Sequence, residues 1–308
     1  MTTHNHLTTY HHLTPEQVFT GKGEMTERMR ALDWSKTPFG AIETWSQNLR
    51  STLNICLTSQ FPIAIYWGKE FLLLYNTAWR PILGDKHPWG MARPGGEVWS
   101  EIWDGIGPEF EGVLETGEGI FRNDEMLPMN RFGYVEECFF DYTLNPIQGE
   151  NGSTDGVINI VIETTYRVLN DRRAQLLREV ASRTGIAKTA EEACAVMVTT
   201  FLSDPKDIPF ALIYLVDEDG KTARLCGSTD SLKESRLSPA VIDLTEGVDD
   251  WSIAQAIQTG ETQILTELET RFGNIPGSPW AEAPQEAVIL PIAATGQAKV
   301  TGVLVAVA

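Results

Sequence analysis

Few side chains of this sequence have the types and spacing that catalysis requires. The only histidine after residue 12 is His87, which precedes a proline in a stretch expected to be a loop. Ser–His–Asp chemistry therefore lacks a plausible histidine. Two adjacent carboxylate pairs, Glu136-Glu137 and Asp124-Glu125, are present, but neighbouring side chains on a strand point to opposite faces. Spacing alone does not make them an acid/base pair, so we expect no catalytic residues in this chain.

Sulfur and imidazole ligands are equally sparse. Cys56, Cys138, Cys194 and Cys226 are scattered through apolar segments and form no CxxC pair. Zinc needs clustered ligands, and a disulfide framework needs denser spacing, so we expect buried, reduced thiols and a cytoplasmic protein. Residues 1–23 are polar and carry four histidines, but termini are commonly disordered. We expect a disordered tail there and no metal site.

Charge and composition exclude several classes of partner. The chain has 308 residues, with 24 basic and 42 acidic side chains and a net charge of −18. Such a surface repels nucleic-acid phosphates and anionic lipids. No run approaches the roughly 18 apolar residues of a membrane span, and the N-terminus lacks the basic and apolar regions of a signal peptide. The length favours two domains.

The elements that would position a site change in type along the first half. Helices are expected near residues 24–32 and 42–58, because apolar side chains there recur every three or four positions. Two short strands and a long helical region follow, and then three more strands. These segments are 62–68, 71–76, 97–116, 119–123, 134–146 and 156–164.

Residues 165–184 contain neither glycine nor proline and are expected to form a connecting helix. A heptad-like stripe runs along this helix, and such a stripe can pair with a second copy of the chain. It is shorter than three heptads, so a simple packed helix is the alternative. The stripe consists of Tyr166, Leu169, Arg173, Leu176 and Val180.

The second half repeats the mixture of helices and strands. The chain stops inside a strand-like run at residues 303–308, so we expect it to be cut from a longer protein. The expected helices are 189–202 and 251–259, and the expected strands are 210–216, 222–226, 262–265, 287–293 and 300–307.

Several motifs resemble known sensory families. Residues 72–79 resemble the end of the second PAS strand, where an asparagine such as Asn76 starts and caps the next helix. The PAS order of two strands, several short helices and three strands fits residues 62–165. Residues 186–308 look like a GAF domain, notably 209–214, 290–292 and 302–305. Three further sets of residues resemble a PAS subgroup found at the front of bacterial sensor histidine kinases. They are Trp34-Ser35 with Pro38-Phe39-Gly40, His87-Pro88 with Gly90, and Arg131-Phe132-Gly133 with Glu136-Glu137.

This resemblance implies an α+β protein with two domains, each an antiparallel sheet flanked by helices. The PAS-like domain would span 24–165, the linker helix 166–184, and a C-terminally truncated GAF-like domain 185–308. The implied function is sensing and relay for a kinase module downstream in the same chain, with the fragment itself not an enzyme. The alternatives are a dimerisation scaffold that senses nothing, or the input module of a phosphatase or cyclic-dinucleotide enzyme.

Seven of the nine tryptophans lie between residues 34 and 103. In a PAS-like domain several of them would lie near the ligand pocket, although an ordinary aromatic core explains them too. The pocket candidates are Trp67, Tyr75, Asn76, Trp79, Trp99, Trp103, Arg131, Tyr134 and Phe140. The candidates for the GAF-like pocket are Tyr214, Cys226 and Trp251.

No cofactor is expected in either pocket. Flavin-binding PAS domains carry an Asn-Cys-Arg motif on a helix, whereas Cys56 precedes the first strand and is expected to face the core. Haem would have to use His87, and a histidine beside proline usually belongs to a turn. A bilin needs a reactive cysteine near a histidine, and neither Cys194 nor Cys226 has one nearby in sequence.

Overall fold

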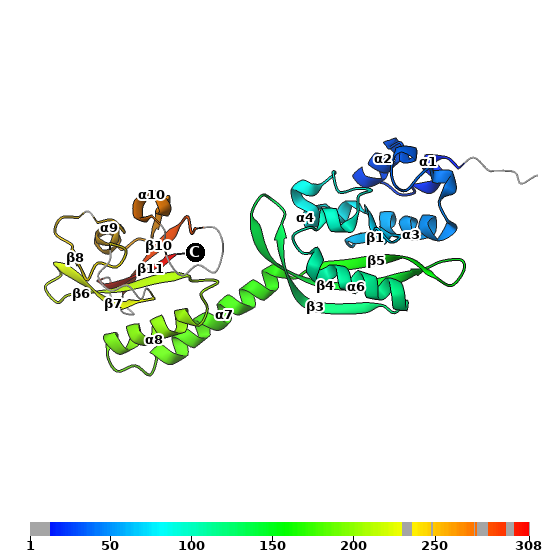
Figure 1. The fold of residues 1–308 in the computed structure, drawn as a ribbon. Coiled ribbons are helices and arrows are strands. Elements are labelled where there is room, and N and C mark those ends of the chain that lie inside the picture. The colour runs from blue at the N-terminus through cyan, green and yellow to red at the C-terminus, as the bar shows by residue number, and fades with distance from the viewer. Residues whose placement is uncertain are drawn as a thin grey trace, which may run out of the picture. The chain divides into compact units, whose positions relative to one another are not determined.

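A computed structural model describes residues 13–229, 236–247, 249–273, 275, 283–293 and 299–307. The chain divides into two compact units, residues 1–169 and 170–308. Each unit has its own antiparallel sheet flanked by helices (Figure 1). The expected pair of helix-flanked antiparallel sheets is therefore confirmed. In the part of the chain described, no helix is both long and apolar enough to cross a bilayer.

The sheet of the N-terminal unit has the order β2-β1-β5-β4-β3, with every neighbouring pair antiparallel. Strands β1 and β2 form a short, almost fully buried hairpin. The long strands β3, β4 and β5 extend the sheet from β1. Their bounds are β1 Ile63–Trp67, β2 Leu72–Tyr75, β3 Ile120–Asn130, β4 Val135–Gln148 and β5 Thr154–Glu163.

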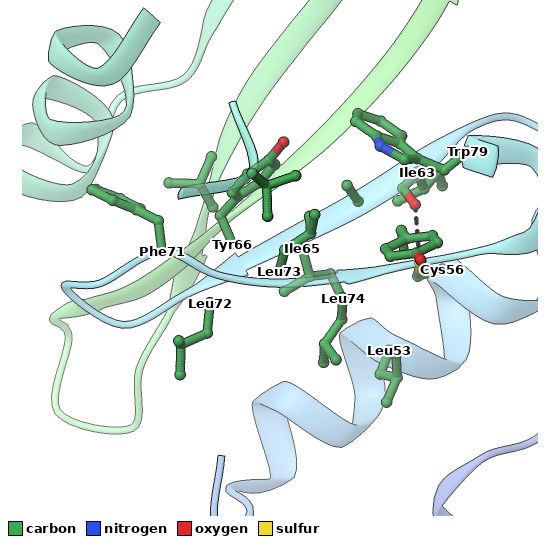
Figure 2. Packing of buried hydrophobic residues seen from close by; sticks show 14 of the residues in the cluster. Leu53, Cys56, Ile63, Ile65, Tyr66, Phe71, Leu72, Leu73, Leu74 and Trp79 are labelled. Carbon is green, nitrogen blue, oxygen red and sulfur yellow. Dashed lines mark hydrogen bonds between the residues drawn. The ribbon is translucent and has the colours of Figure 1, made fainter. Parts of the chain in front are cut away.

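Helices cover both faces of this hairpin. Figure 2 shows Leu72 and Leu74 pointing toward α3, where Leu53 lies, while Tyr66 points to the other face. The elements before β1 are α1 Pro15–Val18, α2 Glu24–Ala31, η1 Trp34–Lys36, η2 Ile42–Thr44 and α3 Gln47–Thr58. Those between β2 and β3 are η3 Thr77–Trp79, α4 Arg80–Leu83, η4 Gly84–Lys86, α5 Gly95–Val98 and α6 Trp103–Thr116.

The segment after residue 12 differs from the expected disordered tail of residues 1–23. Val18 and Phe19 are buried, and the Phe19 ring stacks on Trp34 with a centroid distance of 5.6 Å. Trp45 meets Trp34 edge-on at 4.9 Å. Aromatic contacts of this kind stabilise packing beyond the area they bury, so this polar-looking segment joins the core. The four histidines lie outside the described residues.

The C-terminal unit has a six-stranded antiparallel sheet of order β8-β7-β6-β11-β10-β9. Successive side chains of β6 alternate between two faces. Phe210, Leu212 and Tyr214 join the larger core with Trp251, while Ala211 faces α8. The bounds are α8 Ala190–Leu202, β6 Phe210–Val216, β7 Thr222–Ser228, β8 Val241–Asp243, α9 Ile253–Thr259, β9 Gln263–Leu265, α10 Leu268–Phe272, β10 Ala287–Ala293 and β11 Val300–Val307.

Helix α7, Thr165–Thr184, occupies the expected linker segment. Leu176 and Val180 of its stripe pack against Phe201 and Ala211 of the C-terminal unit. These two residues are therefore used inside the chain and are not free to form a seam with a second copy. The side chain of Arg173 remains 59% exposed.

Candidate functional site

The N-terminal unit contains a cavity of about 40 Å³ between the inner face of its sheet and the helical segment that joins β2 to β3. The helical side contributes Trp79, Ile82, Trp99, Ile102, Ile106 and Phe110. The sheet side contributes Tyr66, Leu127, Met129, Phe140, Tyr142, Asn159 and Val161. The lining has the character of a ligand site, mostly apolar with a few polar groups.

Strand register decides which sheet residues reach the cavity. On β5, Asn159 and Val161 are two positions apart and share the inner face, and Phe140 and Tyr142 do the same on β4. Val161 pairs with Tyr142 across the two strands. The cavity floor is thus a set of alternate residues from neighbouring strands.

Two buried polar atoms on the cavity wall have no hydrogen-bond partner among the described residues: Trp79 Nε1 and Asn159 Oδ1. Trp79 is 2% exposed and Asn159 is 8% exposed. The indole nitrogen can only donate, and the amide oxygen can only accept. Burying either group unpaired costs about 1–3 kcal/mol. The cavity therefore offers one donor and one acceptor to whatever occupies it.

The other polar groups of the lining are uncharged hydroxyls held in place. Trp99 Nε1 donates to the Tyr66 hydroxyl at 2.8 Å, and the Tyr142 hydroxyl donates to Glu109 Oε2 at 2.7 Å. Burial raises the pKa of Tyr66. Burial, assisted by the hydrogen bond to Glu109, also raises the pKa of Tyr142. Both phenols therefore stay neutral, and an uncharged occupant suits this wall.

Three of the nine expected pocket residues line the cavity: Trp79, Trp99 and Phe140. Asn76 instead acts as an internal connector, because its Oδ1 accepts from the backbone nitrogens of Ile63 and Trp79 at 3.2 Å each.

Four other candidates lie elsewhere. Trp67 borders a separate surface groove, and Tyr134 is half exposed. The Trp103 ring packs on Phe110 at a centroid distance of 5.5 Å. The Arg131 guanidinium forms the ion pairs described below. The sequence missed Tyr66, Tyr142 and Asn159; the available signal for Asn159 was a lone amide inside the apolar run 157–162.

Tyr75 belongs to a chain of polar groups away from the cavity. Its hydroxyl lies 3.0 Å from His87 Nδ1, and His87 Nε2 lies 3.2 Å from Glu24 Oε1. Glu24 also pairs with Arg28 at 2.8 Å and with Arg80 at 2.5 Å. The hydrogen bonds from Arg28 and His87 lower the pKa of Glu24. These contacts fasten α2 to the rest of the unit.

Arg131 joins the β3–β4 turn to the end of β5. Its guanidinium pairs with Glu136 at 2.7 Å and with Glu163 at 2.9 Å. Burial lowers the pKa of Arg131, but the two carboxylates outweigh it and raise the pKa overall. Asp124 on β3 binds the Thr164 hydroxyl at 2.7 Å and also pairs with Arg167. The start of α7 is therefore held by charged contacts to the sheet.

The three candidates of the C-terminal unit do not converge on one site. The Tyr214 hydroxyl donates to the Pro239 carbonyl at 2.9 Å, and Trp251 Nε1 donates to the Leu237 carbonyl at 2.8 Å. Both residues are fully buried and hold the segment before β8. Cys226 lies on the opposite, α8-facing side of the sheet, because its neighbour Leu225 faces the larger core and successive strand side chains alternate. A hollow of about 280 Å³ adjoins Trp251.

No protein-family model and no curated protein matches the chain. Solved structures similar to it include GAF domains. The GAF domain of the Acinetobacter phosphoenolpyruvate-protein phosphotransferase is 23% identical, covers 44% of this chain and 76% of its own, and has a TM-score of 0.33. The nlh2 GAF domain of A. aeolicus is 15% identical, with coverages of 46% and 81% and a TM-score of 0.34. A sensory box sensor histidine kinase from Vibrio cholerae is 16% identical, with coverages of 37% and 89% and a TM-score of 0.29.

Proposed function

We propose that the chain is a cytoplasmic sensory input region, and that its PAS-like N-terminal unit binds a small uncharged molecule in the cavity. The observation that carries this proposal is the pair of unpartnered atoms in the lining of this mostly apolar cavity, Trp79 Nε1 from the helical side and Asn159 Oδ1 from the sheet side. The element order of two strands, short helices and three strands supports the PAS resemblance.

The ligand class follows from the volume and the lining. A cavity of about 40 Å³ has room for a few heavy atoms, and it is larger than the roughly 10–15 Å³ that a single water requires. A ligand that accepts from Trp79 and donates to Asn159 relieves two desolvation penalties of about 1–3 kcal/mol each. A small alcohol or primary amide has this pattern. A pair of ordered waters is the competing occupant.

The ligand test uses binding together with two variants that remove one polar atom each. Trp79→Phe deletes the indole N–H, and Asn159→Leu deletes the amide oxygen while keeping a similar shape. We expect small alcohols and amides to raise the Tm of the wild-type protein, and each variant to reduce that shift severalfold. Trp45→Phe is the control, because its indole donates to the Phe39 carbonyl at 3.1 Å, away from the cavity. Equal shifts in all four proteins would contradict ligand binding here.

Cofactor content is settled separately. Native mass spectrometry and an absorption spectrum of freshly purified protein should show a colourless chain of the sequence mass. A visible band would instead support haem, flavin or bilin.

We further propose that a GAF-like C-terminal unit receives the signal through α7 and that the output is a histidine kinase module. The charged contacts of Arg131 and Asp124 at the β5–α7 junction support this route, since they couple the sheet to the first turn of α7. A shift between two packings of this junction would carry the signal. The chain itself should not autophosphorylate with ATP; incorporation of phosphate would refute the assignment. A phosphatase or cyclic-dinucleotide enzyme is the alternative output.

A homodimer through α7 is proposed on the exposure of Tyr166, at 83%, and Leu177, at 69%. Leu177→Glu should give a folded monomer in sedimentation experiments. Leu176→Glu is a poor test, because Leu176 is buried within the chain. Loss of the dimer together with no ligand in either unit would favour the scaffold alternative.

A further inference from the structure

Two thiols of the C-terminal unit meet where α8 packs on β7. Cys194 lies on α8 and is 3% exposed, and Cys226 lies on β7 and is partly exposed. Both are free thiols. Helix α8 lies along the sheet beside β7 in Figure 1. One thiol therefore lies on a helix and the other on a strand, and the two cysteines are 32 residues apart in sequence.

The side chain of Cys226 faces the helix. In the β6–β7 register Ile213 pairs with Gly227 and Tyr214 pairs with Leu225, which leaves Cys226 as an extra residue. Leu225 packs toward the larger core, so the next side chain points to the opposite face, where α8 lies.

Gly227 allows the helix to approach closely. A Cβ at this position would lie 2.6 Å from Val198 Cγ2 and 3.4 Å from the Cys194 carbonyl oxygen, both on α8. Glycine is used where backbones come this near. At this close approach Cys226 belongs to the immediate electrostatic environment of the Cys194 thiol.

The two sulfurs have unequal chemistry. Burial, together with the neighbouring Cys226 and Glu191, raises the pKa of Cys194 to about 12. Cys194 therefore remains protonated and can donate to the other sulfur. Cys226 is the more exposed sulfur, and the thiolate is the form that reacts with oxidants.

We propose that Cys194 and Cys226 are an oxidant-sensitive dithiol site, at which a hydroperoxide produces a reversible intramolecular disulfide. The Cys226 thiolate attacks the O–O bond of the peroxide and becomes a sulfenic acid, and the leaving oxygen takes up a proton. Cys194 sulfur then attacks the Cys226 sulfur, the S–OH bond breaks, and the departing hydroxide takes the Cys194 proton as water. Two thiols and one hydrogen peroxide thus yield one disulfide and two waters.

The disulfide fixes α8 to the sheet. Helix α8 also contacts α7, since Leu176 packs on Phe201 and Arg183 Nη1 donates to Thr200 Oγ1 at 3.2 Å. The cross-link therefore fastens the surface on which the second half of α7 rests. Closing a loop of this length should raise the Tm of the C-terminal unit by roughly 5–10 °C.

The test treats the complete 308-residue chain with a small excess of hydrogen peroxide, alkylates the remaining thiols and measures the mass. We expect a loss of about 2 Da, a cross-link between tryptic peptides 189–206 and 225–233, and reversal by dithiothreitol. The Tm should rise on oxidation and return on reduction. Four alkylated thiols after treatment, or disulfides between chains, would overturn the proposal.

Single-cysteine variants separate the two roles. Cys194→Ser should stop at a sulfenic acid on Cys226, which dimedone traps, and Cys226→Ser and Cys226→Ala should gain neither modification. Cys138→Ser is the matched control, because Cys138 is buried in the other unit, and it should oxidise like the wild type. A disulfide that persists in either Cys226 variant would refute the assignment.

Discussion

The two buried asparagines of the N-terminal unit provide a matched test of how polar burial is handled. Asn76 is 1% exposed and Asn159 is 8% exposed. The Asn76 amide nitrogen donates to the carbonyls of Cys56 at 3.1 Å and Phe61 at 2.7 Å, and its oxygen accepts from Ile63 N at 3.2 Å. Asn159 Oδ1 has no partner among the described residues. The same substitution, Asn→Leu, should therefore destabilise the fold strongly at position 76 and only slightly, if at all, at position 159.

Asn76→Leu removes a hydrogen bond from each of several backbone groups in the interior. The buried Ile63 N–H is left without its partner, which costs about 1–3 kcal/mol, whereas the Cys56 carbonyl still accepts from Ser59 N at 3.2 Å. Loss of the cap on η3 adds about 1 kcal/mol. We expect the free energy of unfolding to fall by about 2–4 kcal/mol, which lowers the urea midpoint by roughly 1–2 M at an m-value of about 2 kcal/mol/M.

Asn159→Leu removes the Oδ1 acceptor, which receives no hydrogen bond from any described residue. We expect a change in the free energy of unfolding of about 1 kcal/mol or less, in either direction. The assay is urea unfolding followed by tryptophan fluorescence, because seven of the nine tryptophans lie in residues 34–103 and report on the N-terminal unit. Equal destabilisation by both substitutions would refute the reasoning, since it would mean that Asn159 is as fully satisfied as Asn76.

Three further perturbations follow from contacts described above. Arg131→Met leaves two carboxylates facing each other at the β5–α7 junction, and we expect the free energy of unfolding to fall by about 3–5 kcal/mol in the same urea assay. Arg122→Met, at a more exposed ion pair, should change the free energy of unfolding by less than about 1 kcal/mol. Because the pKa of Glu24 is depressed, its ionised form stabilises the fold above the ordinary glutamate range, and this stability is lost as the pH falls through the lowered pKa. Glu24→Gln should therefore flatten the dependence of Tm on pH below about 4.3. An unchanged slope would argue against the Glu24 contacts. Asp249 accepts from the backbone nitrogens of Trp251 and Ile253 at 2.9 Å each, so Asp249→Ala should cost about 1–2 kcal/mol and lower the thermal midpoint of the C-terminal unit, while Asp250→Ala should not.

The fold was predictable because local signals agreed with it. The apolar runs around Ile63 and Leu72 predicted a buried hairpin, and the position of Asn76 predicted a capped turn, which its hydrogen bond to Trp79 N bears out. These signals depend on residues that are close in sequence. The cavity depends on strand register instead, which sets whether Asn159 faces inward and which partners it meets. Periodicity within one strand does not specify this.

The expectations that differ from the structure share the same origin. Cys226 was expected in a pocket with Trp251, but it follows Leu225 of the larger core and therefore faces the other side of the sheet. Leu176 was expected either in a seam between chains or on a simple packed helix, and α8 supplies its partner within the chain, as the second alternative predicts. Strand orientation and helix docking both arise from tertiary packing, and a single sequence carries little trace of them.

The aromatic contacts of Phe19 have a consequence for where a separately expressed N-terminal fragment should begin. Phe19 stacks on Trp34 at a centroid distance of 5.6 Å and meets Trp45 in a T-shaped contact at 5.7 Å. A fragment cut at residue 24, where the first long helix starts, would uncover both indoles. Exposed aromatic patches of this kind favour self-association. Such a fragment should be produced in poor yield and should aggregate, whereas one that starts at residue 13 keeps its aromatic cover.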